Sequence, residues 1–281
     1  MVCMPKRVLC LMDLSIVGRA SLSAAPCVLS ACGVQCCPFP ASLLSTHTGG
    51  FENVQILDLS EFGMKALDHI VAEGTHFDAV YIGYLNSPGQ FRLAQKALDE
   101  YPGSKKIVDP SMGDEGSLYQ GITQQTVEGM RALCAQADLI TPNVTESALL
   151  TGNNPSHWTA KEARASLDTL GAKGTSVLVT SVELEEGGLG MLGYVPGENK
   201  RFTVPVNTQP KSYPGTGDLF TAALTGLMLS GMRLAEAAGV AGRFIEAAIR
   251  RTTEGGGVVR QGTWFEPCLH ILTSACEDCR P

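Results

Sequence analysis

Short apolar segments alternate with helical segments along most of the chain, and this alternation is the strongest constraint on its fold. Strands are predicted at Val8–Leu14, Phe77–Tyr84, Lys106–Asp109, Leu139–Thr141 and Ser176–Thr180. Helical spacing of apolar residues occupies the intervals between them, at Glu61–Glu73, Gln90–Tyr101, Thr123–Ala137 and Lys161–Leu170. Strands that alternate with helices imply crossover connections and a parallel sheet with helices on both faces. We therefore expect an α/β fold with a mostly parallel central sheet.

The remaining segments fit the same plan. Further elements are a helix at Ala20–Ala31, strands at Val34–Leu44 and Val54–Leu59, and a hairpin-like pair of strands at Gly190–Val195 and Phe202–Pro205. After Gly217 the pattern changes to consecutive helices, at Leu219–Leu229, Leu234–Arg251 and Phe265–Leu272. There is no internal repeat, low-complexity tract or Pro/Ser-rich linker in the sequence. We expect a single domain over residues 1–281.

Composition and charge limit the partners of the chain. A hydrophobic fraction of 44% and a charged fraction of 17% supply enough apolar surface for a core, which excludes a disordered chain. The 21 Lys and Arg residues are outnumbered by 28 Asp and Glu residues, so the formal net charge is −7. Such a chain has no broad basic surface, and we expect neither a nucleic acid nor an anionic membrane as its partner. Any anionic ligand has to be held locally, by backbone dipoles, a metal ion or a few lysines.

The ten cysteines form no pattern that predicts a disulfide framework or a zinc site. Most of them lie inside apolar runs, where a thiol packs as a small hydrophobic group. The CxxC motif Cys276–Cys279 has no second pair to complete a zinc site. The apolar run Val8–Met12 is too short for a secretory segment, and no run approaches the roughly 20 apolar residues of a membrane span. We expect a reduced, cytoplasmic protein.

Polar or small side chains follow the predicted strands, at the edge of the sheet where open α/β folds bind their ligands. These side chains belong to Ser15, Tyr84, Asp109, Asn143 and the pair Thr180–Ser181. Strands often end at polar residues for structural reasons, so this pattern by itself leaves both a binding site and a chance arrangement open.

A glycine-rich turn, Pro214–Asp218, stands directly before the apolar helix Leu219–Leu229. Two glycines around a small residue allow consecutive backbone N–H groups to point in one direction, and the helix adds the positive end of its dipole. An N-cap for this helix is the structural alternative for Asp218. However, a carboxylate beside an anion pocket repels a phosphate unless it takes the proton of a hydroxyl group that attacks that phosphate. The turn has neither the GxGxxG pattern nor a P-loop pattern.

Several segments, taken together, resemble a known family. Pro214–Asp218 and its helix are similar to the signature of the ribokinase-like superfamily, and Asp109–Asp114 (DPSMGD) resembles the DPVMGD segment of its vitamin kinases. Thr141–Glu146 (TPNVTE) is similar to their TPN-x-x-E segment. Ser15–Arg19 and Ser45–Gly49 resemble the substrate-pocket segments of pyridoxal, pyridoxine and pyridoxamine kinases. The resemblance implies a ribokinase-like three-layer α/β/α sandwich with a mostly parallel central sheet flanked by helices.

The resemblance also implies an activity, namely transfer of a phosphoryl group from ATP to the 5′-hydroxymethyl group of a B6 vitamer. Asp218 is then the catalytic base, which contacts the substrate and accepts its hydroxyl proton. The backbone amides of Gly215, Thr216 and Gly217 form the implied anion hole. K⁺ as a monovalent activator and a homodimeric assembly belong to the same set of expectations.

Binding sites follow from the same resemblance, residue by residue. The implied nucleotide contacts are Asp114, Thr141, Asn143, Glu146, Thr180 and Ser181. Mg²⁺ is expected near Asp109, Tyr119 and Glu146, with Glu146 holding it through water. The implied vitamer contacts, besides Asp218, are Ser15, His47 and Tyr84.

Each of these residues also has a purely structural interpretation. Glu146 is compatible with a first-turn acid that the helix dipole favours, and Asp109 with a strand-ending turn before Pro110. The loop position of His47 favours a solvated histidine, and Tyr84 is compatible with core packing. For Lys211, which precedes the glycine-rich turn, we expect a surface position.

Three other functions remain open on the sequence alone. A hydroxymethylpyrimidine kinase shares the scaffold, although Ser15–Arg19, Ser45–Gly49 and the presence of Asp218 rather than Cys favour a B6 vitamer. A sugar kinase is expected to carry lid strands and an early Gly-Gly segment, which we do not find. A catalytically silent homologue that binds a nucleotide or PLP is the third alternative, and intact Asp218 and Glu146 argue against it.

Overall fold

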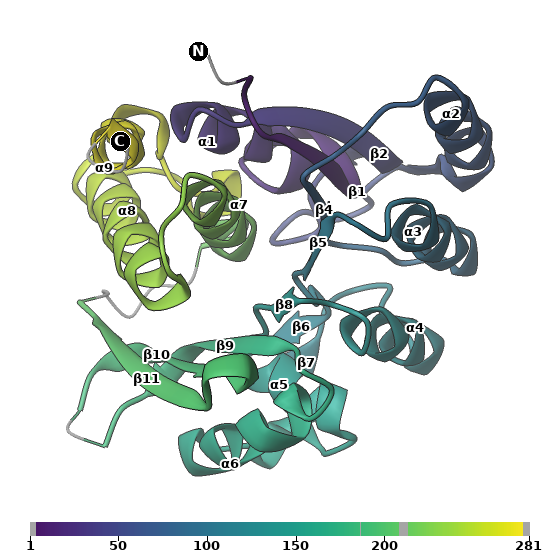
Figure 1. Ribbon diagram of the computed structural model, residues 1–281. Helices are drawn as coiled ribbons and strands as arrows, with labels where there is room; N and C mark the ends of the chain where they lie inside the picture. Colours follow the sequence, from purple (N-terminus) through teal and green to yellow (C-terminus); the bar gives the residue numbers. More distant parts are fainter. Residues whose placement is uncertain (1–3, 186, 208–212, 278–281) are drawn as a thin grey trace.

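The structure, a computed structural model, describes residues 4–185, 187–207 and 213–277, in which a large sheet lies between two groups of helices (Figure 1). The strands of the large sheet are β1 (Arg7–Val17), β2 (Gln35–Thr46), β3 (Ile56–Asp58), β4 (Ala79–Ile82), β5 (Lys105–Val108), β8 (Leu139–Ile140), β9 (Ser176–Glu183), β10 (Leu189–Val195) and β11 (Lys200–Val206). A separate hairpin is formed by β6 (Gly113–Asp114) and β7 (Ser117–Leu118). The α-helices are α1 (Ala25–Ala31), α2 (Ser60–Ala72), α3 (Pro88–Glu100), α4 (Gln124–Cys134), α5 (Val144–Thr151), α6 (Ala160–Gly171), α7 (Thr216–Leu229), α8 (Leu234–Glu254) and α9 (His270–Glu277).

The sheet is mostly parallel, as the alternation of strands and helices predicts. Its strand order is β11-β10-β9-β8-β5-β4-β1-β2-β3. The pairs from β2 through β1, β4, β5 and β8 to β9 are parallel. The pairs β9–β10, β10–β11 and β2–β3 are antiparallel, which confirms the predicted hairpin pair near the end of the sheet.

Helices cover both faces of the sheet because its central strands are apolar on both sides. Along β1, Val8, Cys10 and Met12 belong to a core shared with α1, α7, α8 and α9. Leu9 and Leu11 alternate with them and belong to a second core shared with α2, α3, α4 and α6. Figure 1 shows these two groups of helices on opposite sides of the strands. Burial of the two apolar faces is the main driving force for this arrangement, and the predicted three-layer sandwich is confirmed.

The boundaries of some elements differ from the predicted ones. The helix expected from Ala20 begins at Ala25, because Ser21 adopts a left-handed φ of 46° and opens a short 3₁₀ turn instead. The expected helix at Phe265–Leu272 consists of a 3₁₀ turn at Glu266–Cys268 followed by α9. Helix α5 and the β6–β7 hairpin were not predicted, since both are short and depend on contacts with neighbouring loops.

The cysteines and the membrane prediction can be checked only on the described residues. None of the eight cysteines there is part of a disulfide, while Cys3 and Cys279 lie outside that part of the chain. In the same residues, no helix has both the length and the apolar character that crossing a bilayer requires.

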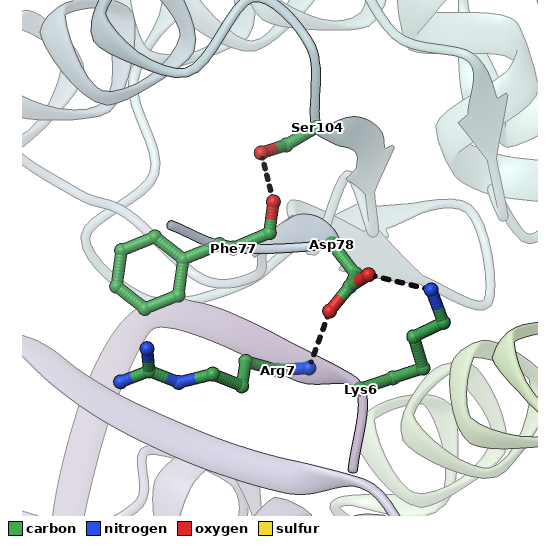
Figure 2. Close-up of polar contacts among 5 residues, drawn as sticks. All are labelled: Lys6, Arg7, Phe77, Asp78 and Ser104. Carbon is green, nitrogen blue, oxygen red and sulfur yellow. Dashed lines mark hydrogen bonds and ion pairs between the residues drawn. The ribbon is translucent and has the colours of Figure 1, made fainter. Parts of the chain in front are cut away.

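A polar cluster lies where the parallel strands begin, at the edge of the sheet opposite to the cavity. It holds the starts of neighbouring strands together. Figure 2 shows Asp78 between Lys6 and Arg7, where its carboxylate accepts hydrogen bonds from the Lys6 Nζ and the Arg7 backbone N–H, both at 2.8 Å. Next to it, the Ser104 hydroxyl donates to the Phe77 carbonyl at 2.6 Å. The cluster ties the residues that precede β1, β4 and β5 to one another.

We expect Asp78→Ala to lower the free energy of unfolding by about 1–2 kcal/mol, because the Arg7 amide loses its acceptor and Lys6 loses its partner. Burial alone would raise the pKa of Asp78, but Lys6 and the Arg7 amide lower it. A lowered pKa stabilises the fold above the unfolded-state value of about 4 and loses its effect as the pH falls below it. The difference in the free energy of unfolding between wild type and variant, measured by urea unfolding, should therefore be smaller at pH 3 than at pH 7. Glu100→Ala, at the exposed end of α3, serves as the control, and an equal effect of both substitutions would contradict the prediction.

Candidate active site

One large cavity lies at the carboxyl ends of the parallel strands. Its volume is about 750 Å³, within the usual range for a small-molecule site. Residues from successive strands line it in the order of the sheet, namely Leu44 on β2, Asp13 on β1, Tyr84 after β4, Asp109 after β5, Thr141 after β8 and Thr180 on β9. Strands β1 and β4 are neighbours whose following helices, α1 and α3, cover opposite faces of the sheet. Ligand crevices form at such a switch point.

Nearly all residues that the sequence singles out line this cavity. They are His47, Tyr84, Asp109, Asp114, Tyr119, Thr141, Asn143, Glu146, Thr180, Ser181, Gly215, Thr216, Gly217 and Asp218. Ser15 is the exception. Strand β1 continues to Val17, so Ser15 lies inside the strand, is 2% exposed and donates its hydroxyl to Asp13 at 2.9 Å. Its position does not support the predicted contact with a pyridine ring, and Asp13 lines the cavity in its place.

Asp218 lies in the first turn of α7, and Gly215 makes that position possible. Gly215 is the N-cap residue of α7 with a φ of 83°, and a Cβ there would come within 2.1 Å of the Arg19 carbonyl oxygen. Only glycine fits such a turn. The structural alternative that Asp218 is itself the N-cap is therefore wrong. The Asp218 carboxylate accepts a hydrogen bond from the Ser21 hydroxyl at 3.5 Å.

The start of α7 provides the predicted anion pocket. The first N–H groups of a helix have no partner within it, and Gly215 offers no side chain to cap them. The Thr216 amide is partly engaged, since it donates to the Tyr213 carbonyl at 3.4 Å. A Cβ built on Gly217 would meet only Asp109 Oδ2, at 3.8 Å. The space in front of Gly217 is therefore open toward the cavity.

Burial and like charges raise the pKa values of the carboxyl groups at the centre of the cavity. Burial, followed by the charge of Asp13, raises the pKa of Asp218 to about 7. Burial and then the charge of Asp218 raise the pKa of Asp109 well above its usual value, which a hydrogen bond from Thr221 partly offsets. Burial and then Asp109 do the same to the pKa of Glu146. A carboxylate with a pKa near 7 is suited to accept a proton at neutral pH.

Positive charge is scarce around these carboxylates. The acidic lining residues are Asp13, Asp109, Asp114, Glu115, Glu146 and Asp218. Among the described lining residues, Arg260 is the only lysine or arginine, and its guanidinium stacks on the Phe51 ring 5.2 Å from the ring centroid. Any anionic ligand has to bring a cation with it. Lys211 lies outside the described residues.

Glu146 and Asn143 form a capping box at the start of α5. The Asn143 Oδ1 accepts from the Glu146 backbone N–H and the Glu146 Oε2 accepts from the Asn143 backbone N–H, both at 2.9 Å. The Met112 amide donates to Glu146 Oε1 at 3.0 Å, and Asn143 Nδ2 donates to the Gly113 carbonyl at 2.8 Å. The structural interpretation of Glu146, as an acid in the first turn of a helix, is therefore correct. The box also fixes a carboxylate, 3% exposed, at the cavity wall.

The other predicted nucleotide contacts surround this box. Thr141 and Thr221 share a hydrogen bond between their hydroxyl groups at 2.9 Å, which ties the end of β8 to α7. Ser181 has a left-handed φ of 59° and is exposed on β9. Asp114 belongs to the β6–β7 hairpin and Tyr119 follows it. Burial and several nearby carboxylates, Glu146 first, raise the pKa of Tyr119, so its phenol is neutral and a poor metal ligand.

His47 and Tyr84 lie at the β2 and β4 end of the cavity, and both are buried. The Gly49 amide donates to His47 Nδ1 at 3.1 Å, so the Nε2–H donates to the Arg260 carbonyl at 2.8 Å. Burial lowers the pKa of His47, which keeps the ring neutral. The predicted solvated histidine is therefore wrong, and the imidazole joins two loops. The Tyr84 hydroxyl has no hydrogen-bond partner within normal geometry in the described structure, although Asn86 is near it.

The polar cavity residues that the sequence did not single out include Asp13, Ser21, Thr221 and Arg260. Asp13 was missed because only the residues that follow each predicted strand were singled out, and Asp13 lies inside the predicted strand Val8–Leu14. The small-residue run after Gly18 was the available signal for Ser21. Thr221 lies inside a helix of apolar pattern and Arg260 in a short 3₁₀ turn, so the sequence carries no local signal for either.

The carboxylates fit a magnesium ion that is bound mainly through water and phosphate. Both oxygens of Glu146 already accept backbone hydrogen bonds. Within the described ranges, no group of three or more His, Cys, Asp or Glu side chains is arranged to hold a metal ion alone. Mg²⁺ prefers oxygen ligands, keeps several waters and is commonly shared with substrate phosphates. The raised pKa values of Asp109 and Glu146 indicate carboxylates that a nearby cation would stabilise in their ionised form.

Known proteins are similar to this chain in sequence and in fold. The family model described as phosphomethylpyrimidine kinase matches residues 22–261. The pyridoxal kinase of Arabidopsis thaliana is 29% identical over 88% of this chain and 82% of its own length. The structure of pyridoxal kinase from Lactobacillus plantarum is 33% identical, with a TM-score of 0.89 over 97% of this chain and 98% of that chain.

A second solved structure links the family model to a B6 compound. It is a candidate phosphomethylpyrimidine kinase from Bacteroides thetaiotaomicron, in a crystal form with pyridoxal. It is 35% identical, with a TM-score of 0.88 over 95% of this chain and 96% of that chain. The chain therefore belongs to the phosphomethylpyrimidine kinase family, and it has the ribokinase-like fold of pyridoxal kinases.

Proposed function

We propose that this chain transfers the terminal phosphoryl group of ATP to the 5′-hydroxymethyl group of a B6 vitamer. The observation that carries the proposal is the position of Asp218, in the first turn of α7 beside an amide pocket and at the centre of one cavity. Its raised pKa of about 7 suits a general base. The pyridoxal kinase from Lactobacillus plantarum and the pyridoxal-containing structure from Bacteroides thetaiotaomicron support the choice of substrate class.

The geometry divides the cavity into two halves. One half is mostly apolar, which suits a pyridine ring, and is lined by Leu44 on β2, His47 after β2 and Tyr84 after β4. The other half, after β8 and on β9, carries Thr141, Thr180 and polar backbone, which suits phosphates and ribose. Asp218 stands between them, so a hydroxyl group from the first half can meet a phosphate from the second. Phosphoryl transfer depends mainly on this kind of positioning.

In the proposed reaction, Asp218 accepts the proton of the 5′-hydroxyl group while that oxygen attacks the terminal phosphorus of ATP. A new O–P bond forms, the bond to the bridging oxygen breaks, and ADP leaves with the electron pair. The amides of Gly215 and Gly217 and the dipole of α7 stabilise the charge on the transferred group. The Thr216 amide contributes less, because it already donates to Tyr213.

Mg²⁺, when bound, neutralises part of the nucleotide charge. Asp109 and Glu146 are the residues that would hold it, Glu146 through water, with Asp114 beside the triphosphate. Tyr119 as a neutral phenol is better suited to donate a hydrogen bond to phosphate than to bind the metal. A requirement for K⁺ stays a prediction.

The assembly and location of the protein are further proposals. Ile16, Val17, Ile56 and Leu57 are between 45% and 68% exposed near the β3 edge of the sheet. An exposed apolar sheet edge favours a contact with another chain, and this supports the expected homodimer. The single-domain organisation of residues 1–281 and the cytoplasmic location also stay predictions.

The name of the matching family model keeps a hydroxymethylpyrimidine as the second candidate substrate. We expect Mg-ATP turnover with pyridoxal, pyridoxine or pyridoxamine to exceed turnover with hydroxymethylpyrimidine by at least about tenfold in kcat/KM. A coupled ADP-release assay over the four compounds measures this. Turnover of the pyrimidine alone would replace the proposed substrate, and no turnover of any compound would favour a silent homologue.

We expect Asp218→Asn to reduce kcat by about two orders of magnitude or more while ATP and vitamer still bind, because the amide cannot accept the proton. For the wild type, kcat/KM should rise with pH through about 7, since the raised pKa of Asp218 leaves the base protonated below that value. The residual activity of the variant should lack this inflection. Steady-state kinetics from pH 5.5 to 9 and calorimetric binding test both points. Unchanged turnover in the variant would remove Asp218 from the mechanism.

We expect Gly217→Ala to leave the fold intact but to lower kcat at least about tenfold, because the new methyl group occupies the open space in front of the anion pocket. The matched control is Gly239→Ala on α8, whose Cβ would meet only the end of the Arg243 side chain at 3.7 Å. Both variants should melt at or slightly above the wild-type temperature, since alanine favours a helix. Full activity of Gly217→Ala would show that no transferred group passes in front of this residue.

A further inference from the structure

Asp13 is a buried carboxylate on the cavity wall to which the mechanism above gives no role. It is 3% exposed and lies on β1, at the switch point between β1 and β4. Its Oδ2 accepts the Ser15 hydroxyl at 2.9 Å. In the part of the chain that the structure describes, none of the ion pairs includes Asp13. Its carboxylate is therefore held by neutral donors, namely the hydroxyl groups of Ser15 and Ser21 and its own backbone N–H.

A buried carboxylate without a cation is costly for a fold, so its presence on a cavity wall requires an explanation. The pairing of β1 with β2 is irregular at Asp13. The register between β1 and β2 shifts at Met12 and Asp13, so Ala41 has no partner on β1. Such bulges redirect side chains and are frequent near active sites. Burial also raises the pKa of Asp13, which means that its ionised form is poorly solvated and would gain from a cation.

Asp13 lies next to the proposed base. The Ser21 hydroxyl lies within hydrogen-bond reach of Asp218 Oδ1, at 3.5 Å, and of Asp13, and its single proton can be donated to only one of the two carboxylates at a time. Ser21 itself is held in a left-handed conformation, with a φ of 46°. Two carboxylates within reach of one hydroxyl group face the same end of the cavity. A ligand that places a hydroxyl group at Asp218 therefore brings its neighbouring substituent close to Asp13.

In the B6 vitamers, the ring carbon beside the 5′-hydroxymethyl group carries the 4′ group. The 4′ group is therefore the substituent that would lie close to Asp13. The 4′ group is an aldehyde in pyridoxal, a neutral hydroxymethyl in pyridoxine and an aminomethyl in pyridoxamine. An aliphatic amine is protonated at neutral pH, so pyridoxamine alone presents a cation at this carbon. A charge-assisted hydrogen bond between an ammonium group and a buried carboxylate is among the stronger polar contacts.

We propose that Asp13 accepts a hydrogen bond from the 4′-ammonium group of pyridoxamine and thereby makes this the preferred vitamer. This inference rests on the proposed function and deepens it, because it selects among substrates of the same site. Asp13 is then a specificity-determining residue, while Asp218 performs the proton transfer. A metal ion is a poorer occupant, since no described group of three or more His, Cys, Asp or Glu side chains is arranged to hold one.

The test compares two vitamers in wild type and in Asp13→Asn, which keeps the size of the side chain and removes its charge. We expect kcat/KM for pyridoxamine to fall about ten- to hundredfold in the variant, the usual effect of losing a hydrogen bond to a charged group. For pyridoxine, kcat/KM should stay within about threefold. Pyridoxine is the internal control, because a merely structural role of Asp13 would affect both vitamers alike. Asp99→Asn, on the exposed surface of α3, should change neither value.

Equal losses for both vitamers would overturn the inference, and would assign Asp13 to the ring nitrogen or to the fold. A second measurement does not depend on the variant. Wild-type protein should bind pyridoxamine at least about tenfold more tightly than 4-deoxypyridoxine, which has a methyl group at the same carbon. Equal affinities would overturn the inference even if Asp13→Asn does not fold. Failure of the proposed function gives a different result, because the wild type would then phosphorylate no vitamer at all.

Discussion

Repulsion between buried carboxylates at one edge of the sheet is the interaction on which the site depends. Asp13, Asp109, Glu146 and Asp218 are brought together by four different elements, and Arg260 is the only lysine or arginine among the described residues of the same wall. Burial raises the pKa values of all four groups, and the charge of a neighbouring carboxylate raises those of Asp109, Glu146 and Asp218 further. The same charges supply a base near neutrality and create a demand for cations that has to be met by the ligands. In the proposed function, magnesium meets it on the nucleotide side and an ammonium group on the vitamer side.

The two glycines of the turn before α7 shape the wall that carries Asp218. Gly215 is required by the fold itself, since any side chain there would collide with the Arg19 carbonyl. Gly217 is different, because the protein leaves the space beside it open. The first glycine therefore places α7 against the cavity, and the second keeps that space free for a ligand. The two glycines of this turn are therefore explained by different physical constraints.

Structural and chemical roles coincide in the same side chains. The capping box of Asn143 and Glu146 begins α5 and at the same time fixes a carboxylate on the cavity wall, in the half that we propose for the nucleotide. Both ring nitrogens of His47 are engaged, Nδ1 with Gly49 in its own loop and Nε2 with the Arg260 carbonyl, so the ring carbons are what His47 presents to a ligand. A structural explanation of such a residue therefore does not exclude a functional one.

The sequence alone determined the α/β class, the two apolar faces of the sheet and the turn that carries Asp218, because periodicity and glycine spacing are local properties. It also placed most polar strand ends correctly, since the carboxyl ends of parallel strands meet at one edge. The exchange of Ser15 for Asp13 was decided by tertiary structure, because the length of β1 and its bulge depend on pairing with β2. Ser21 reaches Asp218 only when the turn before α1 packs against α7, and Thr221 reaches Thr141 only when α7 packs against the end of β8. These hydrogen bonds join residues that are far apart in the sequence, so no local sequence pattern could predict them.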